Sequence, residues 1–341
     1  MADLDQDLAS IDRRKLQSIF IGGGTPSLFS PESINSIISG VRKRLDFAED
    51  IEITLEANPG TLEKNKFKEF KNAGVNRLSI GIQSFDERHL QALGRIHSVA
   101  EATTAAETAH ASGLVNFNLD LMFGLPNQEP SSARNDVLTA IKLQPAHISY
   151  YQLTIEPHTL FHTIKPQLPP EDLIWQVQSD GQDYLNQNGF IQYEVSAYAK
   201  NGSQCHHNLN YWQFGDYLGI GAGAHGKITN TENFSIQRTW KVKHPSQFLK
   251  SAATDARIGK RYNIPTEELP LEFLMNALRL NQGFTESLFS QRTGLARSVL
   301  EQKLTICIEQ GLLEQRSDRI RCSKHGRNFL NDILQRFIPD K

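Results

Sequence analysis

Short apolar segments rich in β-branched residues recur along the first half of the chain, and segments with helical periodicity separate them. The predicted strands are Ser18–Ile21, Ile51–Leu55, Arg77–Ile82, Asn116–Met122 and His147–Gln152. Strands joined by such helices run parallel, because the crossover returns the chain to the same end of the sheet. The repeat therefore predicts an α/β fold, either a (β/α) barrel or an open doubly wound sheet. In both folds, ligands bind at the carboxyl ends of the strands.

Capping residues mark the boundaries of the predicted helices. Ser30, Thr61 and Ser98 stand where three helices begin, and their hydroxyl groups can accept hydrogen bonds from the first backbone amides. Gly74 and Gly113 stand where the second and third of these helices end. The chain should therefore alternate between strand and helix up to about residue 155.

The sequence pattern changes beyond residue 170. A long helix is predicted from Glu171 to Asn188, and an aromatic, histidine- and glycine-rich segment follows it. From about residue 265, amphipathic helices flank the predicted hairpin LLEQRSDRIRCS, which is typical of a small winged-helix-like domain. We expect a barrel region at 1–170, a region at 171–260 that completes the barrel, and a winged-helix-like domain at 261–341.

Composition excludes several classes of protein. The net charge of -2 argues against a protein dominated by nucleic-acid binding. We expect the basic stretch RSDRIRCSKHGR to be a solvated wing or a lid on the barrel mouth. No apolar stretch is long enough for a membrane span, which leaves only peripheral membrane association open. Sparse cysteines and an acidic start without an apolar signal region predict a cytoplasmic protein.

Residues within or after the predicted strands should meet at one mouth of the barrel. They are Gly22-Gly23-Gly24-Thr25, Glu56, Gln83, Arg95 and Asp120. Carboxylates can hold an ammonium group or hydroxyls, and a guanidinium can hold a carboxylate, so the set suits a zwitterionic ligand with a ribose. Taken singly, the glycines are more typical of a tight turn than of a ligand site, and a buried aspartate is often a structural acceptor.

The motifs IGGGTPS, LEANPG, GIQSF, GRIH and DLMFGLPNQ resemble the radical S-adenosylmethionine proteins of the coproporphyrinogen dehydrogenase (HemN) group. The motif HNLNYW is similar to that of the HemW-type haem chaperones within this group. The resemblance covers nearly the whole chain and implies a TIM-type barrel with a small C-terminal domain. It also implies that S-adenosylmethionine is bound by Gly23, Gly24, Thr25, Glu56, Gln83, Arg95 and Asp120.

The resemblance further implies a [4Fe–4S] cluster held by a CxxxCxxC motif, which this sequence does not contain. In the family the motif follows the first barrel strand, so we expect a partial barrel that lacks this strand. Cys205, Cys307 and Cys322 lie too far apart in the sequence to replace the motif, and we predict no metal ligands in this chain. A fragment of a longer gene product and a degenerate form are the two explanations, of which we favour the fragment.

For the HNLNYW motif, the resemblance implies haem binding by His207, Asn208, Tyr211 and Trp212. Imidazole is a common axial ligand of haem iron, and aromatic rings pack on the macrocycle. A polar turn with an aromatic anchor is the alternative reading of these residues. The predicted function is a haem chaperone that delivers haem to respiratory proteins. An oxygen-independent coproporphyrinogen III oxidase and an inactive fragment without a cluster are the alternatives, so whether the chain is an enzyme stays open.

Overall fold

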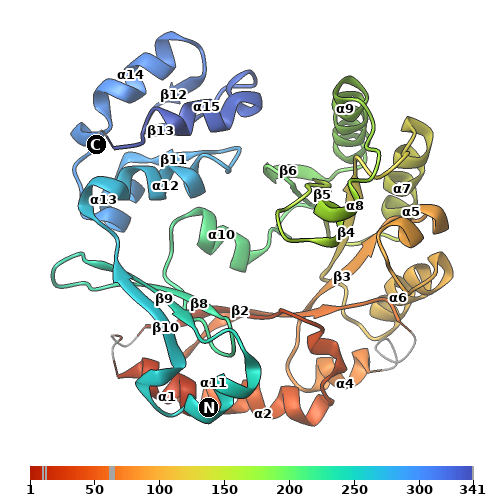
Figure 1. Cartoon of the computed structure of the whole chain (residues 1–341), viewed down its shortest axis with the longest axis horizontal. Helices are drawn as coiled ribbons and strands as arrows, with labels where there is room; N and C mark the ends of the chain where they lie inside the picture. The colour runs from red at the N-terminus through yellow and green to blue at the C-terminus, as the bar shows by residue number, and fades with distance from the viewer. Residues whose placement is uncertain (10, 12–13, 61–65, 340–341) are drawn as a thin grey trace. The chain divides into compact units, whose positions relative to one another are not determined.

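The computed structural model describes residues 1–9, 11, 14–60 and 66–339, which pack into two compact units (Figure 1). The barrel unit comprises Lys15–His207. The C-terminal unit comprises Asn208–Lys341 together with Met1–Arg14 from the start of the chain. The predicted boundaries at residues 170 and 260 stay a prediction.

The barrel unit is built on a curled seven-stranded sheet with the order β1-β2-β3-β4-β5-β7-β6 (Figure 1). Its strands are β1 (Leu16–Ile21), β2 (Phe47–Ala57), β3 (Arg77–Gln83), β4 (Phe117–Phe123), β5 (His147–Gln152), β6 (Ile191–Glu194) and β7 (Ala197–Ala199). Neighbours from β1 to β5 are parallel, whereas β7 is antiparallel to both β5 and β6. The parallel α/β sheet predicted from the strand–helix repeat is confirmed, and its curvature makes it a half-barrel.

Helices of the barrel unit lie between the strands in the sequence. They are α2 (Pro31–Arg42), α4 (Phe67–Asn72), α5 (Glu87–Ala92), α6 (Val99–Ala111), α7 (Pro130–Lys142), α8 (Leu160–Ile164) and α9 (Glu171–Gln187). The predicted caps Ser30 and Ser98 are confirmed, since each side chain accepts a hydrogen bond from the third residue after it. The predicted cap Thr61 lies outside the described residues.

The two faces of the half-barrel differ in chemistry. On β2, Ile53 and Leu55 belong to the apolar core that the sheet shares with helices such as α2, α4 and α6. The intervening residues Glu52, Thr54 and Glu56 point the opposite way, because successive side chains of a strand alternate between faces. The inner face therefore carries polar side chains, even though β2 is buried over most of its length.

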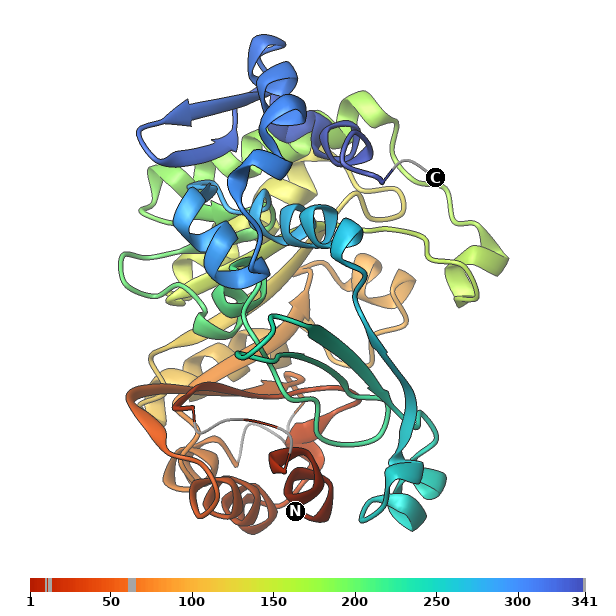
Figure 2. The same cartoon turned by 90° about the vertical axis from the view of Figure 1, so that its left-hand side faces the viewer.

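The C-terminal unit contains two small antiparallel sheets. One has the order β10-β9-β8, formed by β8 (His225–Thr229), β9 (Ile236–Lys241) and β10 (Ile258–Asn263). The other has the order β11-β13-β12, formed by β11 (Phe284–Thr285), β12 (Leu313–Arg316) and β13 (Arg319–Cys322). Its β12–β13 hairpin confirms the hairpin predicted at LLEQRSDRIRCS (Figure 2), and the winged-helix-like character of the domain stays a prediction. The sheet of β8, β9 and β10 was not predicted.

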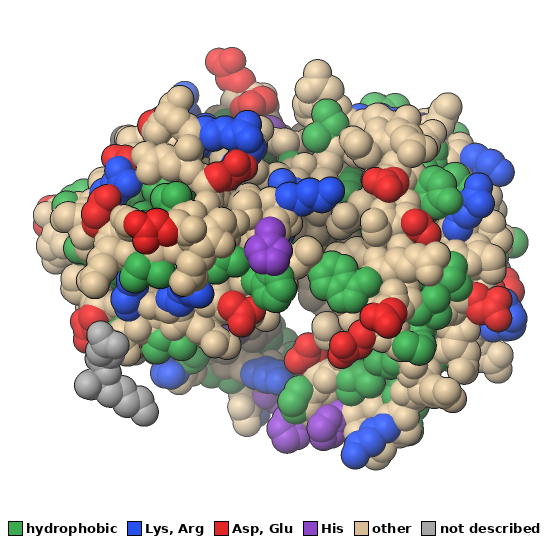
Figure 3. Space-filling model, turned by 90° about the horizontal axis from the view of Figure 1, so that it is seen from above, with side chains coloured by type: hydrophobic (Ala, Val, Ile, Leu, Met, Phe, Trp, Pro, Cys, Tyr) green, Lys and Arg blue, Asp and Glu red, His purple; other side chains and the backbone are tan. Residues whose placement is uncertain are grey.

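The helices of the C-terminal unit are α1 (Ala2–Leu8), α11 (Pro245–Ser251), α12 (Leu269–Ala277), α13 (Glu286–Thr293), α14 (Glu301–Glu309) and α15 (Leu330–Gln335). Helix α10 (His206–Trp212) crosses from the barrel unit into this one. Among the described residues, no helix combines the length and the apolar character that crossing a bilayer requires. Acidic and basic side chains are interspersed on the face drawn in Figure 3. The absence of a nucleic-acid partner stays a prediction.

Candidate functional site

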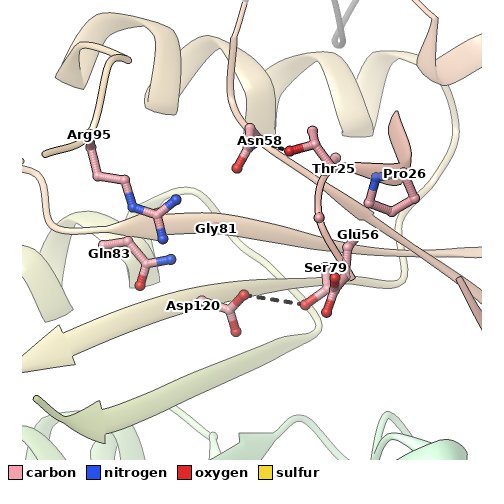
Figure 4. Close-up of a pocket in the computed structure, with 11 residues that line it drawn as sticks. Thr25, Pro26, Glu56, Asn58, Ser79, Gly81, Gln83, Arg95 and Asp120 are labelled. Atoms are coloured by element: carbon pink, nitrogen blue, oxygen red, sulfur yellow. Dashed lines mark hydrogen bonds between the residues drawn. The ribbon is translucent and has the colours of Figure 1, made fainter. Parts of the chain in front are cut away.

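A cavity opens at the carboxyl ends of strands β1 to β4 (Figure 4). Its lining residues are Gly24, Thr25, Pro26, Glu56, Ala57, Asn58, Ser79, Gly81, Gln83, Arg95 and Asp120. Six of the seven residues predicted for S-adenosylmethionine are among them. The seventh, Gly23, lies beside the cavity and donates its backbone N–H to Glu56 Oε2 at 3.0 Å. The structure thus brings the predicted residues of this site together.

The glycine triplet is required by its surroundings. A Cβ atom on Gly22 would lie 2.7 Å from the ring of Phe20 and 2.9 Å from the carboxyl group of Glu56. Gly23 and Gly24 have φ angles of 82° and 61°, in the left-handed region that side chains disfavour. The turn after β1 can therefore approach Glu56 closely, which a chain with Cβ atoms could not do without strain.

Two carboxyl groups face the same cavity. Burial raises the pKa of Glu56, and the nearby Asp120 raises it further, while the Gly23 N–H opposes the shift. Burial also raises the pKa of Asp120, against hydrogen bonds led by the one from Asn118. Among the described residues that line the cavity, Arg95 is the basic one, so the lining combines two carboxyl groups with one guanidinium. Such a site favours a ligand that carries both positive charge and a carboxylate.

Strained backbone places the amide of Gln83 in the cavity. Gln83 has a φ of 73°, and the pairing of β3 with β4 shifts register between Ile80 and Gln83. Tyr151 donates its hydroxyl hydrogen to Gln83 Oε1 at 2.8 Å, which fixes the orientation of the amide. Figure 4 shows Gln83 and Arg95 on the same side of the cavity.

The loop that carries Arg95 is tied to the end of β3. The Nε2 atom of the buried His97 lies 3.1 Å from the carbonyl oxygen of Ile82. Ser98 then begins α6 with a capping box in which Glu101 takes part. These contacts hold Arg95 at the cavity although it belongs to no regular element.

Several lining residues were not singled out from the sequence. Asn58 donates to Thr25 Oγ1 at 3.3 Å, and Ser79 donates to Asp120 Oδ2 at 3.4 Å (Figure 4). Pro26, Ala57 and Gly81 contribute the rest. Asn58 and Gly81 stand in motifs that the resemblance uses, and Ser79 is found by the alternation of polar residues along β3.

His207 lies in the barrel unit, at the start of α10. Its imidazole is stacked on Phe20, with ring centroids 4.7 Å apart and planes at 21°. Its backbone N–H donates to Glu52 Oε1 at 3.1 Å. Burial lowers the pKa of His207 to about 4, outweighing the opposing effect of Glu52, and Arg77 lowers it further. The ring is therefore neutral near pH 7, which is the form that binds a metal ion.

The other predicted haem residues belong to the C-terminal unit. The ring of Tyr211 packs against that of Tyr217 at 4.4 Å, and the guanidinium of Arg279 lies 4.3 Å from the ring centroid of Trp212. Asn208 is half-buried. The four residues share α10, while the division between the units falls directly after His207.

The three cysteines do not form a metal site. Cys205, Cys307 and Cys322 are each buried as thiols, and Cys205 belongs to a different unit from the other two. Within the part of the chain that the structure describes, no group of three His, Cys, Asp or Glu side chains could hold a metal ion. The residues present therefore do not fit a [4Fe–4S] cluster, which needs thiolate ligands close together.

Known proteins match the chain along its whole length. The Radical SAM superfamily model matches residues 2–138, and the HemN C-terminal domain model matches residues 264–329. The chain is 48% identical over 340 residues to the heme chaperone HemW of Haemophilus influenzae, covering 100% of this chain and 88% of that protein. It is 47% identical over 338 residues to the heme chaperone HemW of Escherichia coli, covering 99% of this chain and 88% of that protein.

A solved structure shares the fold. The radical SAM enzyme coproporphyrinogen III oxidase (HemN) of Escherichia coli superposes with a TM-score of 0.81, covering 98% of this chain and 81% of that one. Sequence identity is 19%, so this likeness concerns the fold alone. The predicted radical SAM barrel fold with a smaller C-terminal domain is confirmed.

Proposed function

The chain belongs to the HemW family of radical SAM proteins, and on this premise we propose that it is a chaperone that binds haem and delivers it to respiratory proteins. The observation that carries the proposal is His207, a neutral imidazole held at the start of α10 within the family motif HNLNYW. Asn208, Tyr211 and Trp212 complete the proposed haem site on the same helix. Because all three cysteines are buried as thiols, we place the protein in the cytoplasm, where thiols persist.

The cavity at the strand ends fits S-adenosylmethionine, which supplies a sulfonium centre when bound. In this proposal Arg95 holds the carboxylate of the ligand, and Glu56 and Asp120 accept hydrogen bonds from its ammonium group and ribose hydroxyls. Gly23 and Gly24 admit the ligand to the backbone, with Thr25 and Gln83 beside it. The family also implies a [4Fe–4S] cluster, and none of the described residues is assigned to it.

Replacement of His207 tests the haem site. His207→Ala should weaken haemin binding at least about tenfold, the equivalent of roughly 1.4 kcal/mol, because the imidazole would no longer reach the iron. Titration of the purified chain with haemin, followed by the Soret absorption band, gives both the affinity and the spectral change on ligation.

The neighbouring histidine provides the matched control. His206 is exposed, and only its backbone N–H joins the contacts described above, at 3.1 Å from Glu52. His206→Ala should therefore bind haemin as the unaltered chain does. Equal affinities for the two variants would contradict the assignment of His207, and the absence of haemin binding by the unaltered chain would contradict the chaperone proposal.

The match of residues 264–329 to the HemN C-terminal domain model favours a second candidate function, oxidation of coproporphyrinogen III. The higher identity to proteins named HemW makes it the weaker candidate. An anaerobic assay for protoporphyrinogen decides between them, since product formation would support the oxidase. A chain that binds neither haemin nor S-adenosylmethionine would be an inactive form.

A further inference from the structure

The carboxylate of Glu52 organises the start of α10 from inside the barrel unit. It accepts hydrogen bonds from the backbone N–H groups of His206 and His207, both at 3.1 Å, and the thiol of Cys205 lies 3.4 Å from Oε1. Only 5% of Glu52 is exposed, and Arg77 Nε lies 3.7 Å from its Oε2 atom. The conformation of this turn is therefore set by groups buried in the half-barrel.

A second set of buried groups runs from the same turn to the cavity. The Cys205 N–H donates to the hydroxyl oxygen of Tyr193 at 3.4 Å, and that hydroxyl lies 2.9 Å from His147 Nε2. His147 Nδ1 lies 2.7 Å from Asn118 Oδ1, and Asn118 Nδ2 donates to Asp120 Oδ1 at 2.7 Å. His147, Tyr193 and Asn118 are all buried. An uninterrupted chain of hydrogen bonds thus joins the His207 turn to a lining residue of the cavity.

Each bond in this chain has a defined direction. The amide of Asn118 donates to the carboxylate, so its oxygen accepts from His147 Nδ1–H. His147 Nε2 then accepts from the Tyr193 hydroxyl, which leaves the oxygen of Tyr193 to accept the Cys205 N–H. Burial keeps His147 neutral by lowering its pKa, which agrees with one donor and one acceptor on the ring.

The hydrogen bonds between Asp120 and Tyr193 can also run in the reverse direction, but only if the Asp120 carboxyl group is protonated. If Asp120 were protonated and donated to Asn118, the Asn118 amide would turn over and His147 would have to adopt its other tautomer. The Tyr193 oxygen would then accept from the ring with one lone pair and from the Cys205 N–H with the other, and its own hydrogen would turn away from His147. A cationic group bound beside Asp120 favours the carboxylate, and therefore the first direction.

We propose that Tyr193 is a positioning residue that couples the cavity to His207, so that a cationic ligand at Asp120 strengthens haem binding at the His207 turn. The inference rests on the proposed function, with S-adenosylmethionine as the ligand of the cavity. The two hydrogen-bond directions supply the two states that such coupling needs. Coupling between ligand sites is reciprocal, so haem strengthens S-adenosylmethionine binding by the same factor.

Haemin titrations of the full chain, with and without saturating S-adenosylmethionine, measure the coupling. For the unaltered chain, the ligand should tighten haemin binding at least about fivefold, the low end of typical coupling between sites. Tyr193→Phe should reduce this ratio to less than about twofold, because the hydroxyl that joins Cys205 to His147 is gone. Calorimetry should show that the variant still binds S-adenosylmethionine, so that the ratio of its haemin affinities with and without that ligand can be measured.

Tyr150→Phe is the matched control. Tyr150 is also a buried tyrosine of the barrel unit, but its hydroxyl donates to the carbonyl oxygen of Val177 at 3.3 Å, outside the chain of bonds. Tyr150→Phe should keep the ratio of about fivefold between haemin affinities with and without S-adenosylmethionine. Melting temperatures verify that both variants fold. The inference is overturned if the unaltered chain binds both ligands with independent affinities, or if Tyr193→Phe keeps the full ratio. Failure of the proposed function gives a different result, since haemin or S-adenosylmethionine would not bind at all.

Discussion

Individual residues in the cavity are held in states that cost free energy. Glu56 and Asp120 are carboxyl groups that face each other's charge in a partly buried site, and Gln83 adopts a left-handed conformation. Such features persist where the surrounding structure imposes them, and they gather at ligand-binding sites. A ligand with a positive charge relieves the repulsion between the two carboxyl groups.

Removal of the Glu56 charge should lower the affinity for the ligand without lowering the stability of the protein. Glu56→Gln should weaken S-adenosylmethionine binding about tenfold, near the 1.5 kcal/mol of one hydrogen bond to a charged group. Its melting temperature should not fall, because the variant no longer buries a carboxylate beside Asp120. Calorimetry and thermal unfolding measure the two effects. Glu49→Gln, at an exposed position on the same strand, is the control, and a similar loss of affinity there would refute the role of Glu56.

At the scale of elements, α7 stabilises the loop that follows β3. The carboxyl group of Asp136 on this helix accepts the backbone N–H of Phe85 at 2.6 Å and the hydroxyl of Ser84 at 2.7 Å. These residues directly follow Gln83, so the strained end of β3 is tied to a helix that packs on the outer face. Burial raises the pKa of Asp136 to about 7, in spite of these hydrogen bonds.

This shift predicts how stability depends on pH. The folded protein holds a proton on Asp136 up to about pH 7, whereas the unfolded chain releases it near pH 4. Stability contributed by this group should therefore fall as the pH rises from 4 to 7 and change little above that. Asp136→Asn cannot ionise, so the difference between its melting temperatures at pH 5 and pH 7 should be smaller than in the unaltered chain. Asp172→Asn, exposed on α9, should keep the original difference. An unchanged difference in Asp136→Asn would contradict the prediction.

At the scale of the whole molecule, the first helix joins the C-terminal unit through buried charges. Asp3 of α1 accepts hydrogen bonds from Lys241 and from Arg257 Nε, and Asp7 accepts from Lys241 at 2.7 Å and from Arg257 at 2.6 Å. The Asp3 carboxylate also accepts the backbone N–H of Gly221 at 2.9 Å. Asp3, Lys241 and Arg257 are all less than 5% exposed, so the cluster is shielded from water. The exposed Asp255 adds a third carboxylate at the edge of the cluster, 3.2 Å from Arg257.

Loss of one carboxylate from this cluster should release α1. Asp3→Asn leaves the two buried cations with Asp7 and the exposed Asp255, and breaking a buried ion pair costs about 3–5 kcal/mol. Hydrogen exchange of residues 2–8 should accelerate, and the melting temperature should fall. Asp5→Asn on the exposed side of the same helix should change neither measurement by much. Slow exchange in Asp3→Asn would show that apolar packing, and not the ion cluster, holds the helix.

Much of the fold and half of the site could be predicted from local patterns. The strand His147–Gln152 was predicted with its observed bounds, and Ser98 was recognised as a cap, because strand alternation and capping depend on neighbouring residues. The cavity residues were predicted as one group because parallel strands present their carboxyl ends together. Tyr151 and His97 were missed, since a tyrosine in a strand and a histidine in a loop have no local signature of their partners.

The sequence by itself determined the parallel strand–helix repeat, the chemistry of the strand ends and the family motifs. These depend on residue type and spacing, which are properties of the linear chain. Only the tertiary structure decided that α1 packs with residues 208–341, and that Glu52 and Tyr193 meet the turn at Cys205. The partners in these contacts are separated by 12 to 254 positions. Such contacts form only when the core closes and buried polar groups must find hydrogen-bond partners in place of water.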